Sequence, residues 1–239
     1  MPSATAPVLP IWNRLVRFIG EDGNEYCGEP VDLELDVGLA MEQNEPVMVK
    51  LLSGTSALDF DTVFTGGVVR AREILTPITP AEAGTIRCIG LNYTDHAAEM
   101  KLPLPTNPEV FFKPSTCLNA PSSPIHLPAL AASSADLEVE LAVVLGADAK
   151  DVSAATAMHG PGIGVEAHAA RSERVGVEDV AEIIAYLSVG TTLKKGTVIL
   201  TGTPSGIGHS YKPPVYLAEG DMMKIWISHG LGTLTNPIV

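Results

Sequence analysis

The stretch ADLEVELAVVLG, residues 135–146, decides the expected fold of this chain. Asp136, Glu138 and Glu140 alternate with apolar residues, and an apolar run then continues to Gly146. Side chains two residues apart point to the same face of a β-strand. The stretch therefore predicts a strand that buries one apolar face and carries three carboxylates on the other.

Three carboxylates on one strand face repel one another unless a cation or solvent lies among them. Carboxylate oxygens are hard ligands that suit Mg²⁺, Mn²⁺ or Ca²⁺. Alternating Glu residues are also frequent on the water-exposed face of an antiparallel sheet. The spacing alone therefore leaves a metal site and a solvated strand face as two open interpretations.

Other short runs of the chain alternate apolar and polar residues between turns rich in Gly, Pro and Asn, which is typical of strands. One such turn is Glu-Asp-Gly-Asn at 21–24. The expected strands are RLVRFI, EYCGEPV, EPVMVKLLSG, TIRCIGLNY, EVFFKP, GTVILTGTP and MMKIWISHGLGTLTN. A helix is expected where apolar residues recur at helical spacing, at Val177, Val180, Ile183, Ile184 and Leu187. A mixed, strand-dominated fold with few helices follows.

The balance of charged residues and the cysteines exclude several classes of protein. The 239 residues include 28 acidic and 15 basic ones, a formal net charge of -13, whereas nucleic-acid binding depends on neutralising phosphates with Lys and Arg. Cys27, Cys88 and Cys117 form no CxxC pair, which indicates neither a disulfide framework nor a zinc site. No stretch reaches the roughly 20 apolar residues of a membrane span, and the start lacks a signal-peptide pattern. We expect a soluble, cytoplasmic protein without nucleic-acid or membrane partners.

His96 and Glu99 lie three residues apart in GLNYTDHAAEM, residues 90–100, where helical spacing follows a β-like run. On a helix this spacing turns both side chains to the same side, so that the carboxylate can orient the imidazole. The helix is expected to have Asn92 or Thr94 as its cap. The pair is a candidate general base, and a solvated helix surface is the alternative interpretation.

Five sequence blocks occur in an order that resembles the fumarylacetoacetate hydrolase family, which includes acylpyruvate hydrolases and oxaloacetate decarboxylases and tautomerases. They span most of residues 85–157 and 178–239, whereas the first 80 residues resemble the family only loosely. The blocks are GLNYTDHAAEM, NPEVFFKPST, LEVELAVVLG, EIIAYLSVGTTLKKGTVILTGTPSGIG and LAEGDMMKIWISHGLGTLTN. The resemblance implies an α+β fold with a central mixed β-roll. It also implies a small β-rich N-terminal region at 1–82 and a catalytic domain at 83–239.

By matching position, the resemblance implies roles for six residues. Two glutamates are implied as metal ligands, a His–Glu dyad as the group that activates water or moves a proton, and a lysine and a threonine as substrate-binding residues. In that order they are Glu138 and Glu140, His96 with Glu99, Lys113 and Thr203. Without the family, Lys113 would be interpreted as a strand residue whose stem covers apolar surface, and Thr203 as a turn residue beside Pro204.

The chemistry of the family explains this set of residues. A divalent cation, Mg²⁺ or Mn²⁺, chelated by a 2-oxo acid polarises the ketone and stabilises the enolate formed when a C–C bond breaks or a proton leaves. The favoured function is metal-dependent hydrolysis of a C–C bond in a 2,4-dioxo acid such as an acylpyruvate. Oxaloacetate decarboxylation or keto-enol tautomerisation needs the same parts and stays open. The resemblance implies a homodimer, and no nucleotide cofactor is expected.

The resemblance breaks after residue 158. The family continues there to an aspartate that is the third metal ligand, and then through a segment with a catalytic lysine. This chain has Ala167 at the place of the aspartate, with Glu166 and His168 beside it. Either neighbour would need a one-residue shift, which reverses the side-chain direction in a strand. We expect the domain to be shortened around 159–177, by divergence or by an artefact of gene prediction or splicing.

Two other functions compete with this interpretation. Residues 162–167, GIGVEA, match the loose GxGxxA form of a dinucleotide-binding fingerprint, but the apolar strand that must precede it is absent. The stronger competitor is a scaffold protein that keeps the fold and has lost the chemistry. Metal-dependent turnover of oxaloacetate or an acylpyruvate, compared with the His96→Ala and Glu138→Ala variants, separates a scaffold from an enzyme.

Overall fold

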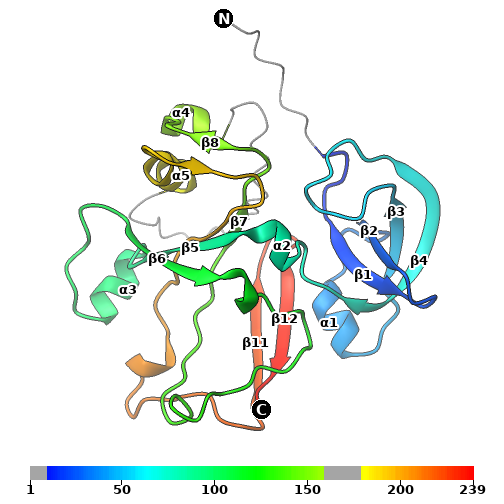
Figure 1. The fold of residues 1–239 in the computed structure, drawn as a ribbon. Coiled ribbons are helices and arrows are strands. Elements are labelled where there is room, and N and C mark those ends of the chain that lie inside the picture. Colours follow the sequence, from blue (N-terminus) through cyan, green and yellow to red (C-terminus); the bar gives the residue numbers. More distant parts are fainter. Residues whose placement is uncertain (1–9, 159–178) are drawn as a thin grey trace, which may run out of the picture. The chain divides into compact units, whose positions relative to one another are not determined.

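A computed structural model describes residues 10–158 and 179–239, which form short strands and short helices (Figure 1). The strands predominate, and the expected α+β class is confirmed. The described residues fall into two compact units. Unit 1 takes those of 81–117 and 130–217, and unit 2 takes 10–80, 118–129 and 218–239. The expected domains, divided between residues 82 and 83, stay a prediction.

Unit 1 is built on a four-stranded mixed sheet with the order β6-β5-β10-β7. Strand β5 pairs antiparallel with β6 and parallel with β10, and β10 pairs antiparallel with β7. The strands of the unit are β5 (Thr85–Gly90), β6 (Glu109–Pro114), β7 (Ala142–Val144), β10 (Val198–Leu200) and the small pair β8 (Ala149–Lys150) and β9 (Thr192–Leu193). The helices are α3 (Thr94–Glu99), α4 (Ala154–Ala157), α5 (Val180–Ser188) and the 3₁₀ turns η1 (Ser115–Cys117) and η2 (Gly208–Ser210), while α2 (Pro80–Ala83) spans the boundary in sequence.

One face of this sheet is buried under α5. Ile89, Val143 and Ile199, from three neighbouring strands, form an apolar cluster with Ile184 and Leu187 of the helix. All five side chains are almost fully removed from water, and burying an aliphatic side chain contributes about 1.5–3 kcal/mol. This cluster fixes α5 against one face of the sheet.

Helix α5 begins with a reciprocal cap. Oδ1 of Asp179 accepts the backbone N–H of Glu182 at 2.8 Å, and Oε2 of Glu182 accepts the N–H of Asp179 at 3.0 Å. This capping box satisfies two of the N–H groups that a helix start leaves free. The expected apolar stripe is confirmed from Val180 to Leu187, whereas Val177 lies outside the described residues.

The strand expected over the carboxylate stretch is shorter than its pattern predicts. β7 starts only at Ala142, so the expectation of a strand from Asp136 onward is wrong. Residues 139–141 still lie opposite 201–203, but side chains take the place of backbone partners in most of these hydrogen bonds. Residues 139–141 therefore lie beside 201–203 without forming a regular β-ladder.

Unit 2 contains a closed barrel of four antiparallel strands. The barrel strands are β1 (Val16–Gly20), β2 (Glu25–Pro30), β3 (Met48–Leu52) and β4 (Phe64–Ile74). The expected turn at 21–24 joins the first two, closed by a hydrogen bond from Gly20 N to Asn24 O at 2.9 Å. Phe18, Val47 and Val49 are fully buried inside the barrel.

Unit 2 also contains α1 (Val37–Glu42) and the hairpin of β11 (Met222–Ile227) and β12 (Gly232–Pro237). Asp36 caps α1 by accepting the N–H of Leu39 at 3.0 Å, and it accepts both the N–H and the hydroxyl of Thr233 at 3.0 and 2.7 Å. A Cβ at Gly38 would overlap the carbonyl oxygen of Thr233. Glycine at this position is therefore required for the helix to approach β12.

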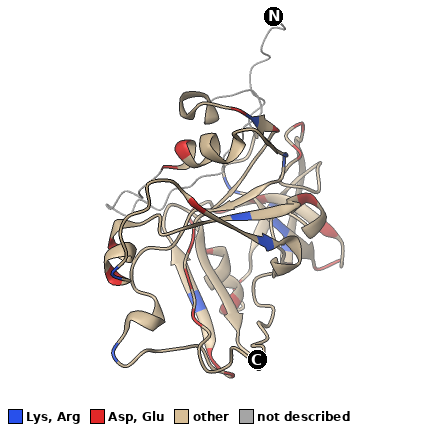
Figure 2. Ribbon diagram, turned by 60° about the vertical axis from the view of Figure 1, so that its left-hand side comes forward, with Lys and Arg blue, Asp and Glu red and all other residues tan. Residues whose placement is uncertain are grey.

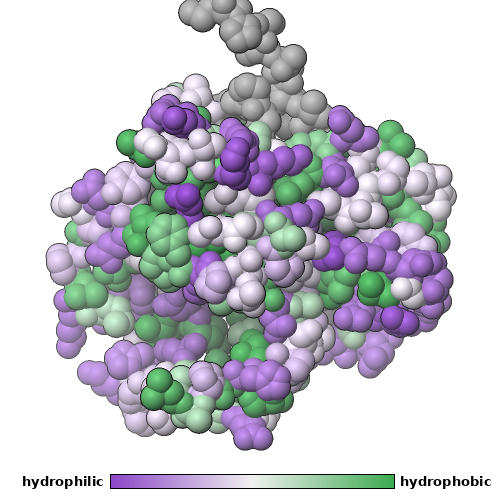
Figure 3. All heavy atoms as spheres, in the orientation of Figure 1, coloured by the Kyte–Doolittle hydropathy of each residue, from purple (hydrophilic) through white to green (hydrophobic). Residues whose placement is uncertain are grey.

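The chain has 28 acidic and 15 basic residues, and those of the described part are coloured red and blue along the ribbon in Figure 2. Hydrophilic and hydrophobic residues are interspersed on the face drawn in Figure 3. None of the helices in the described part of the chain is long and apolar enough to span a bilayer.

Candidate active site

Glu140 lies on the segment opposite the residues that follow β10, and its Oε2 accepts the backbone N–H of Gly202 at 2.6 Å. Burial raises the pKa of Glu140, and this hydrogen bond opposes the shift; the charge of Glu138 raises the pKa further and that of Lys113 lowers it. Glu138 itself is exposed and Lys113 is half-buried. Both expected metal carboxylates and the expected substrate lysine therefore lie within electrostatic range of one another.

The strand register explains why Lys113 lies near Glu140. Lys113 on β6, Cys88 on β5, Leu200 on β10 and Ala142 on β7 share one face of the sheet, because paired residues and residues two apart point the same way. Glu140 precedes Ala142 by two residues. This face is the one opposite α5, so the strand register places the lysine and the carboxylate segment on the same side of the sheet.

The expected dyad forms on α3. His96 is buried, and its Nδ1 lies 3.1 Å from Oε2 of Glu99. Burial acts to raise the pKa of Glu99, but hydrogen bonds from Ser210, from His96 and from the backbone N–H of Gly206 lower it below its usual value. Glu99 is thus ionised at neutral pH beside the imidazole, an arrangement suited to orienting a general base.

Helix α3 starts differently from the expectation. Its N-cap is Tyr93, and no side chain accepts a cap hydrogen bond. Asn92 instead donates its Nδ2 to the carbonyl oxygen of Thr201 at 2.9 Å. The expected caps Asn92 and Thr94 are therefore wrong, because a tertiary partner after β10 takes the side chain of Asn92.

The glycine loop, which we define as residues 202–210, donates hydrogen bonds to four carboxylates. These are Gly202 N to Glu140 (2.6 Å), Ser205 Oγ to Asp95 (3.0 Å), Gly206 N to Glu99 (2.9 Å), and the N–H groups of Gly208 and His209 to Asp136 (2.9 and 2.6 Å). One acceptor, Glu140, belongs to the expected metal pair, and another, Glu99, belongs to the dyad. A single loop therefore contacts both halves of the candidate site.

Thr203, the expected substrate-binding threonine, lies in the glycine loop and is buried. Its Oγ1 accepts the N–H of Val139 at 3.2 Å, which places it beside the segment that carries Glu138 and Glu140. A hydroxyl that accepts one hydrogen bond can still donate another. Thr203 is thus positioned to donate to a group bound near the two glutamates.

Asp136 has a different place from its two neighbours in the carboxylate stretch. Its oxygens accept the N–H groups of Gly208 and His209, the start of η2, and also its own neighbour's N–H at Leu137. Asp136 is therefore neither a solvated strand residue nor part of a carboxylate triplet, because it binds the backbone of the glycine loop. Only Glu138 and Glu140 are left as a pair.

Tyr93 is a residue that sequence reasoning did not single out. Burial raises the pKa of Tyr93, a hydrogen bond with the side chain of Thr201 lowers it, and the charges of Glu140 and Asp95 raise it. The side chain therefore lies between the start of α3 and the carboxylate segment. In the sequence, Tyr93 could have been found as a site residue only because it stands in the same block as His96, GLNYTDHAAEM.

Glu138 and Glu140 fit a divalent cation that prefers oxygen ligands. They are neighbouring carboxylates whose charges repel each other, and a cation would relieve this repulsion. Within residues 10–158 and 179–239, no three His, Cys, Asp or Glu side chains come together as a metal-binding group. The positions considered for a third ligand, Glu166, Ala167 and His168, lie outside the described residues, so the ligand set stays a prediction.

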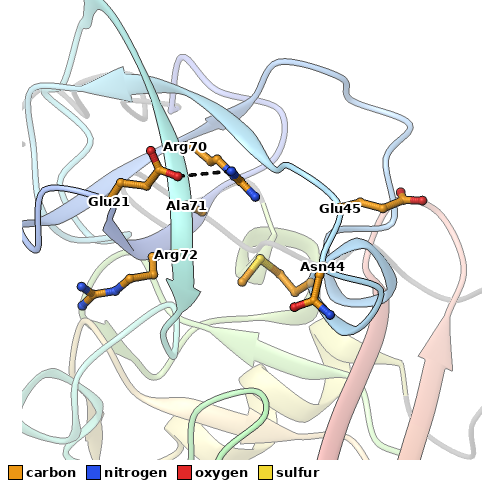
Figure 4. Close-up of a pocket in the computed structure, with 7 residues that line it drawn as sticks. Glu21, Asn44, Glu45, Arg70, Ala71 and Arg72 are labelled. Atoms are coloured by element: carbon orange, nitrogen blue, oxygen red, sulfur yellow. Dashed lines mark ion pairs between the residues drawn. The ribbon is translucent and has the colours of Figure 1, made fainter.

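A surface pocket belongs to the barrel and not to this site. Arg70 points toward Glu21 in it, with an ion pair of 3.3 Å (Figure 4). Its lining residues are Glu21, Met41, Asn44, Glu45, Arg70, Ala71 and Arg72. None of the six candidate residues takes part, and nothing in this pocket resembles the expected chemistry.

Comparison with known proteins gives the family. The chain matches the family described as fumarylacetoacetate (FAA) hydrolase, C-terminal, over residues 85–160 and 169–239. It is 34% identical to a caffeoylpyruvate hydrolase of Neonothopanus nambi, covering 98% of this chain and 95% of the relative. That alignment spans 275 residues, more than the 239 of this chain, so part of the relative has no counterpart here.

A second relative is a mitochondrial oxaloacetate tautomerase of Xenopus laevis, 29% identical over 70% of this chain and 68% of the relative. Among solved structures, the fold is similar to a 2-hydroxyhepta-2,4-diene-1,7-dioate isomerase from Mycobacterium marinum, with TM-score 0.67, 29% identity, and 95% and 98% of the two chains covered. A 5-carboxymethyl-2-hydroxymuconate delta-isomerase from Mycobacterium smegmatis matches with TM-score 0.68, 26% identity, and 95% and 99% coverage.

The matched residues extend over more than half of the chain and include all six candidate site residues. The first relative is matched along nearly its whole length. These findings confirm the resemblance seen in the five sequence blocks: the chain belongs to the fumarylacetoacetate hydrolase family and is an enzyme.

Proposed function

We propose that this enzyme is a metal-dependent hydrolase that cleaves a C–C bond in a 2,4-dioxo acid such as an acylpyruvate. The observation that carries the proposal is the contact of the glycine loop with both Glu140 and Glu99. This contact supports a metal site and a proton-transfer dyad that serve one substrate. The relative named as a caffeoylpyruvate hydrolase supports an acylpyruvate as the substrate class.

Glu138 and Glu140 would hold Mg²⁺ or Mn²⁺, and no nucleotide cofactor is part of the proposal. When bound, the cation supplies polarisation of the substrate's 2-oxo group and balances negative charge. Lys113 lies on the same sheet face as Glu140 and would attract the substrate carboxylate by its charge. Thr203 would donate its hydroxyl to that carboxylate, since its oxygen already accepts from Val139.

His96 would be the general base. The ionised Glu99 can only accept a hydrogen bond, so Nδ1 of His96 carries the proton that it donates. Nε2 of His96 is then the nitrogen that is free to act as the base. Nε2 takes a proton from a water molecule while the oxygen of that water attacks the acyl carbonyl of the substrate. The bond between the acyl carbon and C3 then breaks, Nε2 returns its proton to C3, and the products are a carboxylic acid and pyruvate.

Keto-enol tautomerisation or decarboxylation of oxaloacetate is the second candidate. The Xenopus laevis relative is named as an oxaloacetate tautomerase, and both reactions need a 2-oxo acid bound at the same carboxylates with one proton transfer. Neither requires a water to attack. Product analysis therefore separates the candidates, because only hydrolysis of an acylpyruvate releases a second carboxylic acid.

The test uses purified full chain with Mn²⁺ or Mg²⁺ and measures turnover of acetylpyruvate, benzoylpyruvate and oxaloacetate. We expect acylpyruvate cleavage that EDTA abolishes and Mn²⁺ restores. Turnover of oxaloacetate alone would favour the second candidate. Turnover of none, together with no thermal shift by Mn²⁺, would contradict both candidates. Light scattering would test the homodimer that the family resemblance supports.

A further inference from the structure

We propose that Asn92 is a positioning residue of the metal site. Its side chain fixes the peptide group that joins Thr201 to Gly202, and this peptide group in turn holds the carboxylate of Glu140 in place for the cation. The inference rests on the proposed function, because it takes Glu140 as a metal ligand. It adds a residue from outside the six candidates and names the group through which that residue acts.

A single peptide group makes both of the hydrogen bonds concerned. The carbonyl of Thr201 and the N–H of Gly202 belong to one peptide plane and point in opposite directions from it. The carbonyl oxygen accepts Nδ2 of Asn92 at 2.9 Å, and the N–H donates to Oε2 of Glu140 at 2.6 Å. Asn92 and Glu140 therefore lie on opposite sides of this peptide group, and a rotation of its plane would weaken both hydrogen bonds.

The backbone in front of this peptide group is fixed by Leu141, the residue that follows Glu140. The backbone N–H and the hydroxyl of Thr201 both donate to the carbonyl oxygen of Leu141, each at 3.1 Å. These contacts place Thr201 beside the carboxylate segment, but the orientation of the next peptide plane also depends on the ψ angle of Thr201. The hydrogen bond from Asn92 acts beyond that angle and therefore fixes the plane itself.

Gly202 allows Asn92 to come this close. Its φ is 91°, a backbone conformation that glycine adopts without strain. A Cβ at this position would lie 3.0 Å from the carbonyl oxygen of Ile89 and 3.1 Å from Cβ of Asn92. Glycine also has the most freely rotating backbone, so the peptide plane in front of it needs an external hydrogen bond to keep one orientation.

The contact between Asn92 and Thr201 is shielded from water. Asn92 is 4% exposed and Thr201 is 3% exposed. Hydrogen bonds in series polarise one another in such a low-dielectric environment, so donation to the carbonyl makes the N–H on the other side a better donor to Glu140. Residues that orient a ligating carboxylate typically contribute about 10–100-fold to metal affinity. Loss of the Asn92 amide should therefore weaken metal binding although Glu140 is still present.

The first experiment measures Mn²⁺ affinity by calorimetry in Asn92→Ala and in Asn92→Leu, which has a similar size and no donor. We expect both variants to bind Mn²⁺ about 10–100-fold more weakly than the wild type. The matched control is Asn236→Ala in unit 2. Asn236 is also buried, and its Nδ2 donates to the carbonyl oxygens of Ala120 and Ser123, both at 2.9 Å. Asn236→Ala should lose stability in the same way and keep its Mn²⁺ affinity.

The second experiment observes the peptide group directly, without metal. Threonine labelled with ¹³C at the carbonyl and glycine labelled with ¹⁵N select Thr–Gly pairs in the NMR spectrum, and the sequence has two, at 65–66 and 201–202. A short hydrogen bond to a carboxylate moves an amide proton downfield. We expect the Gly202 proton to lie downfield in the wild type and to move upfield in both Asn92 variants. The proton of Gly66, exposed on β4, should not move.

Failure of this proposal differs from failure of the proposed function. Wild-type Mn²⁺ affinity in the Asn92 variants, an unmoved Gly202 resonance, or an equal loss of affinity in Asn236→Ala overturns the role of Asn92 and leaves the hydrolase in place. Absence of Mn²⁺ binding by the wild type overturns the proposed function and this inference with it.

Thermal unfolding shows whether each variant is folded. If neither Asn92 variant folds, a Mg²⁺ titration of the labelled wild type decides the outcome. The Gly202 resonance should then shift with bound Mg²⁺ while that of Gly66 stays in place, and a Gly202 resonance that does not shift overturns the proposal.

Discussion

Gly202 donates its backbone N–H to Oε2 of Glu140 at 2.6 Å, a short hydrogen bond to a partly buried carboxylate. Four residues later Gly206 makes the equivalent contact to Oε1 of Glu99 at 2.9 Å. Hydrogen bonds from N–H groups to charged carboxylates are stronger than those between neutral groups. The glycine loop therefore orients the proposed metal ligand and the proposed dyad together, and its perturbation should affect both.

Glu140→Gln separates the charge of this side chain from its hydrogen bond. The amide oxygen of Gln can still accept the N–H of Gly202, so the free energy of unfolding should change by less than about 1 kcal/mol. Loss of the charge should weaken Mn²⁺ binding, measured by calorimetry, and abolish metal-dependent turnover. Glu219→Gln, at an exposed position of unit 2, is the control. Wild-type Mn²⁺ affinity in Glu140→Gln would contradict the proposed ligand role.

His96→Asn should lower kcat by about a hundredfold to ten-thousandfold, the usual contribution of a general base. Glu99→Gln should lower kcat by a smaller factor, because it removes the carboxylate that orients the imidazole. Mn²⁺ affinity should stay at the wild-type value in both variants. Steady-state kinetics with metal titration checks this, and a variant that loses metal and activity together would place the dyad among the ligands.

Gly206→Ala tests the glycine loop through its backbone. Gly206 has φ 118° and a Cβ there would meet no atom within 4 Å, so the cost is conformational and of order 1–3 kcal/mol. Strain at this position should move the N–H away from Glu99 and lower kcat. The matched control is Gly23→Ala in the barrel turn, with φ 82° and equally open space. Gly23→Ala should lose a comparable amount of stability but keep its activity. Equal activities of the two variants would refute a role of the Gly206 N–H in orienting Glu99.

Asp36 should make the stability of the enzyme depend on pH. Burial acts to raise its pKa, but hydrogen bonds from Thr233 and Leu39 and the charge of Arg14 lower it below its usual value. Because the folded pKa is lower than the unfolded value of about 3.9, the stabilisation is complete above that pH and is lost as the pH falls through the folded pKa. Asp36→Ala should cost about 1–2 kcal/mol near pH 7. Denaturant unfolding should show this difference shrink below about pH 4, and a constant difference down to pH 2 would contradict it.

The local elements of the chain were predictable where one period dominates the sequence. Val180 to Leu187 has helical spacing and forms α5, and the runs around Cys88 and Ile199 form paired strands. The dyad was also predictable, because His96 and Glu99 lie on one short helix and their contact depends only on helical spacing.

Contacts that join distant parts of the chain were not predictable in the same way. Asp136 and Glu140 share one alternating pattern, yet Asp136 accepts from the start of η2, 72 residues later. Asn92 is a good cap by residue type, yet it bonds Thr201 across 109 residues. Polar side chains near a strand end or helix start have several possible partners, and only the folded chain selects one.

The close approach of Gly38 to Thr233 has a consequence for biosynthesis. Asp36 leaves the ribosome before its partner Thr233, which follows 197 positions later in the chain. Closing so long a loop is entropically costly and slow. Nascent chains therefore lack the contact of Asp36 with Thr233 until β12 has been translated, and during that interval Asp36 caps α1 without its partner on the hairpin.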